Sequence, residues 1–261
     1  MRAAAGFRSE RRQPARGVVL SLATILGILG AGVACSAGGN GEGTTSDPEG
    51  HARRERLEMV EAQLVARGVT DPRVLTAMRK VPRHLFVPAH DRSYAYSDGP
   101  LPIGHEQTIS QPYIVAIMTA LLRPTASMKV LEVGTGSGYQ AAVLAECVSE
   151  VFTIEIVEPL GRRAEALLRE LGYGNIHVRI GDGYDGWPEE APFDAIVVTA
   201  APERVPEPLV AQLRVGGRLV LPLGAGVQDL VVLTKTPRGV VREDVFGVRF
   251  VPMTGKVRRD R

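Results

Sequence analysis

The stretch Lys129–Tyr139, K-V-L-E-V-G-T-G-S-G-Y, joins a short apolar run to a cluster of glycines. An apolar run that stops at glycines is typical of a buried parallel strand. Gly134, Gly136 and Gly138 have no Cβ atom, so the backbone can turn sharply there and approach a ligand closely. Residues 139–146 then have helix-forming composition. The stretch therefore predicts a strand, a glycine-rich turn and a helix N-terminus in succession.

Acidic residues near this turn indicate what kind of ligand it binds. Glu155 ends a second apolar run about 20 positions after Gly134, where a doubly wound fold places its acceptor for a ribose hydroxyl. The glycine spacing is G-x-G-x-G, whereas dinucleotide-binding proteins use G-x-G-x-x-G. Glu132 comes shortly before the first glycine, where a carboxylate would repel a pyrophosphate but could attract a cation. S-adenosyl-L-methionine (AdoMet) has a ribose, an ammonium and a sulfonium but no phosphate. We interpret the turn as an AdoMet site, with a plain tight turn as the alternative.

The composition of the whole chain excludes several classes of protein. Its 261 residues suffice for one large domain or two small ones, with the 44% hydrophobic and 23% charged content of a soluble globular protein. The formal net charge of +2 gives no reason to expect nucleic acid as a partner. Cys35 and Cys147 form no C-x-x-C pair, which excludes a disulfide framework and a cysteine zinc site. The histidines also lack metal-ligand spacing, so we expect no metal.

The first fifty residues do not have the pattern of a folded domain. An arginine-rich start is followed by the uncharged, mostly apolar run Val18–Ala34 and then by Cys35. This is the layout of a secretory signal with a lipoprotein processing site, which would make the protein exported or membrane-anchored through Cys35. Ser36–Gly50 is rich in Gly, Ser and Thr, as in a flexible tether. We predict a signal-like segment and linker over residues 1–50 and a single domain over residues 51–261. The alternative is an upstream start codon, with the real protein beginning nearer residue 50.

The remaining chain changes from helical spacing to alternating strands and helices. Helices are predicted at 53–68, 71–81, 113–122, 159–171 and 206–213, and strands at 151–155, 176–180, 193–199, 218–222, 230–235 and 245–251. The last two strands follow each other without a helix between them. The pattern predicts N-terminal helices and a doubly wound, mostly parallel sheet with an antiparallel edge. Residues 82–112 have little periodicity, and an ordered loop of this length usually has a function.

From about residue 53 to the end, the chain resembles the protein-L-isoaspartate O-methyltransferase family. The segments that carry the resemblance are L-P-I-G (101–104), Q-T-I-S-Q-P (107–112), E-V-G-T-G-S-G-Y-Q (132–140), G-D-G (181–183), F-D-A-I-V-V-T-A-A-P (193–202) and R-F-V-P-M-T-G (249–255). The first, second and last are far more specific than the glycine turn, which any AdoMet methyltransferase could contain. The resemblance covers about 210 residues and leaves out the first fifty.

This resemblance implies a fold, an activity and a compartment. The fold would be a Rossmann-like class I AdoMet methyltransferase with a seven-stranded sheet. The activity would be methylation of the α-carboxylate of L-isoaspartyl residues in damaged proteins, after which the methyl ester collapses to a succinimide and opens partly to normal aspartate. The partners would be damaged proteins and peptides, with AdoMet as cofactor, and we expect a monomer. The family is typically cytoplasmic, and membrane attachment would follow only from a lipoprotein signal at the N-terminus.

The resemblance also assigns roles to individual residues. Ser110 matches the active-site serine, and Ser110 and Thr254 would bind the substrate. The loop before Ser110 would lie over the cofactor, the glycine turn would contact its methionine portion, Glu155 its ribose, and Asp182 with Gly183 its adenine. The full set of cofactor-binding residues is Gln107, Thr108, Ile109, Glu132, Gly134, Thr135, Gly136, Ser137, Gly138, Glu155, Asp182 and Gly183.

Such a reaction needs few catalytic side chains. A carboxylate with a pKa of about 4 is already ionised at neutral pH and can attack a sulfonium methyl group in line without a general base. Ser110 is therefore interpreted as a hydrogen-bond donor to that carboxylate rather than as a nucleophile. Two local alternatives remain, because Ser110 could cap the following helix and Asp182 could be a turn residue.

A rival function is a surface-anchored, methyltransferase-like module whose activity differs or has lapsed. This rival arises because AdoMet is made in the cytosol, so that an exported copy would lack its cofactor.

Overall fold

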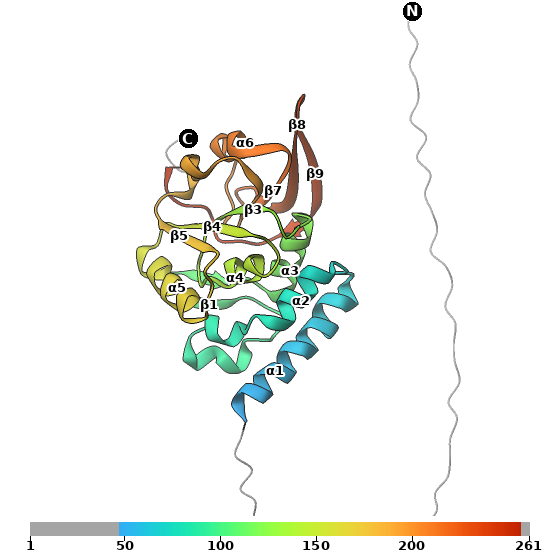
Figure 1. The fold of residues 1–261 in the computed structure, drawn as a ribbon, viewed down its shortest axis with the longest axis vertical. Helices are drawn as coiled ribbons and strands as arrows, with labels where there is room; N and C mark the ends of the chain where they lie inside the picture. The colour runs from blue at the N-terminus through green and yellow to red at the C-terminus, as the bar shows by residue number, and fades with distance from the viewer. Residues whose placement is uncertain (1–46, 257–261) are drawn as a thin grey trace, which may run out of the picture. The chain divides into compact units, whose positions relative to one another are not determined.

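The computed structural model describes residues 47–256, and the predicted signal-like segment and most of the predicted linker fall outside them (Figure 1). The linker was predicted to reach Gly50, but helix α1 already begins at Pro48. Asp47 is its N-cap, and the Asp47 carboxylate accepts a hydrogen bond of 2.9 Å from the backbone N–H of Gly50. Proline at the first helical position after an acidic cap starts a helix, so the end of the predicted linker is helical instead.

The described chain contains every predicted helix and strand, mostly with ends shifted by a few residues. The α-helices are α1 (Pro48–Met59), α2 (Pro72–Lys80), α3 (Pro112–Leu121), α4 (Tyr139–Ala145), α5 (Glu158–Glu170) and α6 (Glu207–Gln212). The short helical turns are η1 (Val60–Leu64), η2 (Val65–Arg67), η3 (Arg83–Phe86), η4 (Ala89–Tyr94), η5 (Gly183–Asp185) and η6 (Pro188–Glu190). The strands are β1 (Leu101–Gly104), β2 (Gln107–Ile109), β3 (Lys129–Val133), β4 (Glu150–Glu155), β5 (Ile176–Ile180), β6 (Phe193–Val198), β7 (Leu213–Leu223), β8 (Gln228–Thr236) and β9 (Gly239–Val248). The helix predicted at 53–68 is divided into α1, η1 and η2, and strand β9 begins at Gly239 and not at Val245.

Seven strands form one sheet in the order β5-β4-β3-β6-β7-β8-β9. Strands β3 to β7 pair in parallel, whereas β7 with β8 and β8 with β9 pair antiparallel. The prediction of a doubly wound, mostly parallel sheet with an antiparallel edge is confirmed. Strand order reverses between β3 and β6, and ligands of such sheets bind at the carboxyl ends of the strands beside this switch point.

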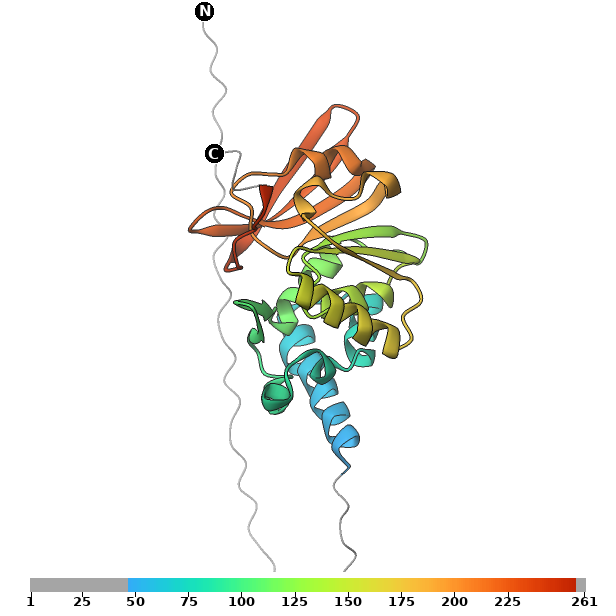
Figure 2. The same ribbon diagram turned by 90° about the vertical axis from the view of Figure 1, so that its left-hand side faces the viewer.

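The two faces of the sheet are buried against different parts of the chain. Because successive side chains of a strand point to opposite faces, Val130 belongs to one apolar core and Leu131 to the other. The first core includes side chains from α1 to α5, and the second includes Leu209 of α6 and Met253 near the C-terminal end. Figures 1 and 2 show the N-terminal helices at one end of the described part of the chain and the β8–β9 hairpin toward the other end.

The irregular region 82–112 contains a small hairpin that the sequence did not indicate. Strands β1 and β2 pair antiparallel and form a separate two-stranded sheet. Its turn residues, His105 and Glu106, have φ angles of 53° and 59°, a left-handed conformation that favours Gly and Asn. Without an Asn-Gly or Asp-Gly signal, the hairpin could not be found from sequence. Its second strand carries the Gln107–Ile109 stretch toward the switch point.

Candidate active site

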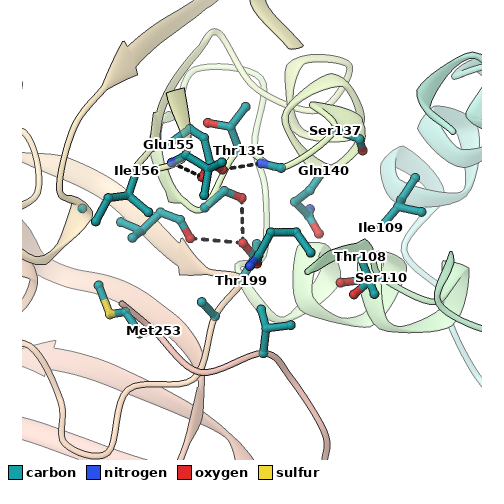
Figure 3. Close-up of a pocket in the computed structure, with 18 of the residues that line it drawn as sticks. Thr108, Ile109, Ser110, Thr135, Ser137, Gln140, Glu155, Ile156, Thr199 and Met253 are labelled. Atoms are coloured by element: carbon teal, nitrogen blue, oxygen red, sulfur yellow. Dashed lines mark hydrogen bonds between the residues drawn. The ribbon is translucent and has the colours of Figure 1, made fainter. Parts of the chain in front are cut away.

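One pocket lies at the carboxyl ends of β3, β4 and β6, with about 840 Å³ of empty space including the part open to solvent. Its walls come from strand β2 with Ser110, the turn after β3, the start of α4, the end of β4, the residues after β6 and the C-terminal segment 251–254. In Figure 3, Thr108, Ile109 and Ser110 lie on one side and Ile156 and Met253 on the other.

The glycine turn is closed by main-chain contacts, and at Gly134 it leaves no room for a side chain. The backbone N–H groups of Gly134 and Thr135 both donate to the carbonyl oxygen of Ile154, at 2.8 and 3.2 Å. A Cβ atom on Gly134 would lie 2.3 Å from Thr199 Oγ1, and the φ of Gly134 is +100°. Thr199 Oγ1 donates in turn to the Gly134 carbonyl oxygen at 2.6 Å. The turn therefore requires glycine at this position, as predicted from the strand–turn–helix pattern.

Glu155 lies at the pocket wall and also supports the turn. One carboxylate oxygen accepts a hydrogen bond of 2.7 Å from the backbone N–H of Gly136, and the other accepts one of 2.8 Å from Val157 N–H (Figure 3). A carboxylate offers about four lone-pair sites, so these two bonds leave acceptor capacity for a ligand hydroxyl. The predicted position for a ribose acceptor is therefore open on the pocket side.

Glu132, predicted to contact the cofactor, lies beneath the turn and does not line the pocket. Its side chain is fully buried, with Oε2 accepting from Thr153 Oγ1 at 2.6 Å, and Thr153 Oγ1 lies 2.6 Å from Thr135 Oγ1. Oε1 has no hydrogen-bond partner among the described residues. Burial, together with the nearby charge of Glu155, raises the pKa of Glu132 to about 8. The carboxyl group is therefore mostly neutral at pH 7, because β3 is a central strand buried on both faces.

Ser110 lines the pocket with its hydroxyl free for a ligand. Helix α3 has Gln111 as its N-cap and no side-chain capping bond, so the alternative role of Ser110 as a helix cap is excluded. No hydrogen bond joins its hydroxyl to another side chain or to the backbone within residues 47–256, whereas its carbonyl oxygen accepts from Arg83 Nη2 at 2.7 Å. The main chain of Ser110 is therefore fixed while its side chain remains available.

The C-terminal wall of the pocket is attached through the buried side chain of Gln228. Its amide oxygen accepts from the Phe250 N–H at 2.6 Å, and its amide nitrogen donates to the Phe250 carbonyl oxygen at 3.1 Å. Ala201 continues this pairing, since its N–H donates to Val251 and its carbonyl accepts from Met253, both at 2.8 Å. These bonds bring segment 251–254, with Thr254, to the pocket.

Asp182, predicted to contact adenine with a turn residue as the alternative, is the N-cap of the helical turn η5. Its carboxylate accepts hydrogen bonds from the backbone N–H groups of Tyr184 at 3.0 Å and Lys256 at 2.7 Å, which anchors the end of the C-terminal segment. Its neighbour Gly183 lines the pocket, but Asp182 does not. Gly138 is also absent from the wall, since it is the left-handed N-cap of α4. All the other predicted site residues, apart from Glu132, line the pocket.

Sequence reasoning missed several lining residues that tertiary contacts place at the site. Thr199 directly follows β6, which pairs with β3. Its position at the carboxyl end of a central strand could have identified it from sequence as a site residue. Gln140 is held toward the pocket by a 2.7 Å bond from its Nε2 to Thr119 Oγ1. Ile156 is 42% exposed at the rim.

Over residues 47–256, no group of three or more His, Cys, Asp or Glu side chains is placed to hold a metal ion. No helix in this range is long and apolar enough to span a bilayer.

Comparisons with known proteins agree with this geometry. Residues 54–258 match the family described as protein-L-isoaspartate(D-aspartate) O-methyltransferase. A protein-L-isoaspartate O-methyltransferase of Gloeobacter violaceus is 61% identical over 198 residues, covering 75% of this chain and 97% of the relative. A protein-L-isoaspartate O-methyltransferase 2 of an Anaeromyxobacter species is 53% identical, covering 92% of this chain and 98% of the relative.

One solved structure that is similar to this chain contains a bound ligand. It is a protein-L-isoaspartate O-methyltransferase, described as putative, from Plasmodium falciparum in complex with S-adenosyl-L-homocysteine. It is 26% identical with a TM-score of 0.66, and the match covers 76% of this chain and 98% of that one. The chain belongs to the protein-L-isoaspartate(D-aspartate) O-methyltransferase family.

Proposed function

We propose that this protein transfers the methyl group of AdoMet to the α-carboxylate of L-isoaspartyl residues in damaged proteins and so starts their repair. One observation carries the proposal. A single pocket is lined both by the glycine turn and by Ser110, whose hydroxyl is free. The family assignment supports the choice of reaction, and the complex of the Plasmodium falciparum relative with S-adenosyl-L-homocysteine supports the choice of cofactor.

The cofactor would lie along the carboxyl ends of β3 and β4. In our proposal the turn Gly134–Gly138 holds its methionine portion, Glu155 accepts from its ribose, and Gly183 lies beside its adenine. Ile156 offers an exposed apolar surface next to Glu155, which suits the face of an aromatic base. Gln107, Thr108 and Ile109 would cover the cofactor from the opposite side, where the β1–β2 hairpin places them.

The protein's contribution to the reaction is alignment. Bound AdoMet supplies an electrophilic methyl group, and the isoaspartyl carboxylate is already an anion at neutral pH. Ser110 would donate a hydrogen bond to one carboxylate oxygen so that the other points along the bond to be broken, with Thr254 contacting the substrate nearby. Good alignment of two reactants is worth roughly 7–11 kcal/mol. The later collapse of the ester to a succinimide is intramolecular and needs no residue of the enzyme.

The test compares two peptides that differ only in one linkage. We expect the full chain to bind AdoMet and to transfer a radiolabelled methyl group to an L-isoaspartyl peptide but not to its aspartyl counterpart. Equal labelling of both peptides would contradict the repair function. Failure to bind AdoMet would favour the lapsed module described above.

The compartment and assembly are part of the proposal. We place the protein in the cytoplasm, where AdoMet is made, and expect it to act as a monomer. Mass spectrometry of the native N-terminus tests the first point, because a diacylated Cys35 would show membrane anchoring and an intact Met1 would not. Size-exclusion chromatography with light scattering tests the second.

A further inference from the structure

Arg83 is a fully buried arginine directly behind the wall that carries Ser110. It begins the short helical turn η3, and its side chain is 0% exposed. Arg83 Nε donates to the Ala95 carbonyl oxygen and Arg83 Nη2 to the Ser110 carbonyl oxygen, both at 2.7 Å. Its guanidinium carbon lies 4.8 Å from the centre of the Tyr139 ring. Ser110 and Tyr139 both line the pocket, so the guanidinium contacts the back of the wall at two places.

The charge of Arg83 has no counterion in the described part of the chain. Within residues 47–256 the groups that act on its charge are the hydroxyls of Tyr139 and Tyr96 and not a carboxylate, and its Nη1 has no hydrogen-bond partner. Buried charges are normally paired, because removal from water is costly when no opposite charge compensates. Burial lowers the pKa of Arg83 to about 10, which still leaves the group charged at neutral pH. The protein therefore keeps an unpaired positive charge beside the position proposed for the methyl acceptor.

A second buried arginine shows that this placement is specific to Arg83. Arg56 is 6% exposed and donates from Nε to the Arg79 carbonyl oxygen at 2.8 Å and from Nη1 to Tyr96 Oη at 3.3 Å. Neither of these partners lines the pocket. Both arginines connect segments of the N-terminal region, but only Arg83 contacts residues that line the proposed active site. Arg56 is therefore the matched control for any effect of removing a buried guanidinium.

We propose that Arg83 is a selectivity and positioning residue, whose buried charge favours an anionic carboxylate over a neutral group beside Ser110. A charge in a poorly solvated wall acts on a nearby ligand with little screening by water. The methyl acceptor is an anion, whereas an amide of the same shape is neutral and gains nothing from the field. The bond from Nη2 to the Ser110 carbonyl oxygen also fixes the main chain from which the serine hydroxyl projects. This inference rests on the function proposed above.

The experiment measures how much more tightly the protein binds a charged peptide than a neutral one. The full chain, loaded with unreactive S-adenosyl-L-homocysteine, is titrated calorimetrically with an L-isoaspartyl peptide and with the same peptide carrying an α-carboxamide. We expect the wild-type protein to bind the carboxylate peptide at least about tenfold more tightly. Arg83→Met should reduce this ratio to about threefold or less. Arg83→Lys should restore most of the ratio, because it keeps a positive charge, and Arg56→Met should leave it unchanged.

The ratio separates an electrostatic role from a merely structural one. Equal weakening of both peptides in Arg83→Met, or an unchanged ratio, would overturn the inference. If Arg83→Met does not fold, as judged by its failure to bind S-adenosyl-L-homocysteine, Arg83→Gln is measured instead, since glutamine is neutral and can still donate to Ser110. The proposed function is tested separately by the wild-type protein. Absence of methylation of the isoaspartyl peptide by the wild type would overturn that function and the inference with it.

Discussion

The pocket lining has two parts, a cofactor wall formed by the glycine turn and Glu155 and a substrate wall, and they are held by different kinds of contact. The glycine turn is fixed by main-chain bonds to β4, by Thr199 and by Glu155, all at the ends of neighbouring central strands. The substrate wall consists of Ser110 and of segment 251–254, which are far apart in the chain. Figure 3 shows Ser110 and Met253 on different sides of the pocket. Long side chains from elsewhere hold these two segments, namely Arg83 at Ser110 and Gln228 at Phe250.

This difference implies that cofactor binding and substrate recognition can be separated by mutation. Changes at the ends of the central strands should reduce AdoMet affinity, because the contacts made there hold the turn in place. Changes in the side chains that hold the substrate wall should mainly weaken binding of the damaged substrate. The four predictions below test this separation.

The largest effect is expected for Gly134→Val. A side chain here would meet Thr199 Oγ1 at 2.3 Å with φ at +100°, a conformation that β-branched residues avoid. Strain of this kind costs about 1–3 kcal/mol before the contact is counted, so AdoMet affinity should fall by roughly 100-fold or more. Isothermal titration calorimetry measures the dissociation constant for AdoMet. Gly174→Ala, where an added Cβ meets nothing within 4 Å, should bind normally. Normal binding by Gly134→Val would show that the turn adapts.

Ser110→Ala should affect turnover and leave the cofactor in place. A hydrogen bond to a charged group contributes about 1.5–3 kcal/mol, so kcat/KM for an isoaspartyl peptide should fall roughly 10- to 100-fold. The dissociation constant for AdoMet should change by less than about twofold, because the cofactor wall is held independently. Unchanged turnover would remove Ser110 from the site.

Gln228→Leu should weaken substrate binding more than cofactor binding. The change removes both hydrogen bonds to Phe250 and frees the segment that carries Thr254. Each such bond contributes about 1 kcal/mol, so KM for the peptide should rise roughly tenfold while AdoMet affinity changes less than about threefold. Gln63→Leu is the control, since Gln63 also donates to a backbone carbonyl, that of Tyr96, outside the active-site pocket. A larger loss for AdoMet than for peptide would contradict the separation of the walls.

Glu132→Gln should have the smallest effect on ligand binding and a measurable effect on stability. The pKa of Glu132 is raised from 4.5 to about 8 by burial, so the native state must keep a proton that the unfolded chain releases above pH 4.5. The resulting loss of folding stability grows as pH rises and levels off near pH 8. A glutamine at this position causes no such loss, because it does not ionise. The stability gain of the variant over wild type should therefore increase by up to about 1.4 kcal/mol per pH unit in this window. Urea unfolding at several pH values measures it. A constant difference would show that Glu132 is ionised in the folded protein.

Local sequence patterns were sufficient for the α-helices, for the strands of the seven-stranded sheet and for most of the cofactor wall. The apolar runs of β3, β4 and β6 and the glycine spacing are local, and parallel strands bring their carboxyl ends to one edge. The two errors have different physical origins. Glu132 was expected to face the ligand, but a central strand buries both of its faces. The β1–β2 hairpin was missed, because its turn uses His105 and Glu106 in place of Asn or Gly.

The sequence by itself determined the sheet, the glycine turn and, through specific motifs, the family and its reaction. Only the tertiary structure decided which side chains hold the substrate wall. Arg83, Gln228 and Asp182 act on backbone groups many residues away, and no periodicity or spacing records such contacts. A strand or a turn is specified by the conformational preferences of adjacent residues. A hydrogen bond across the fold is specified only when packing brings its two ends together.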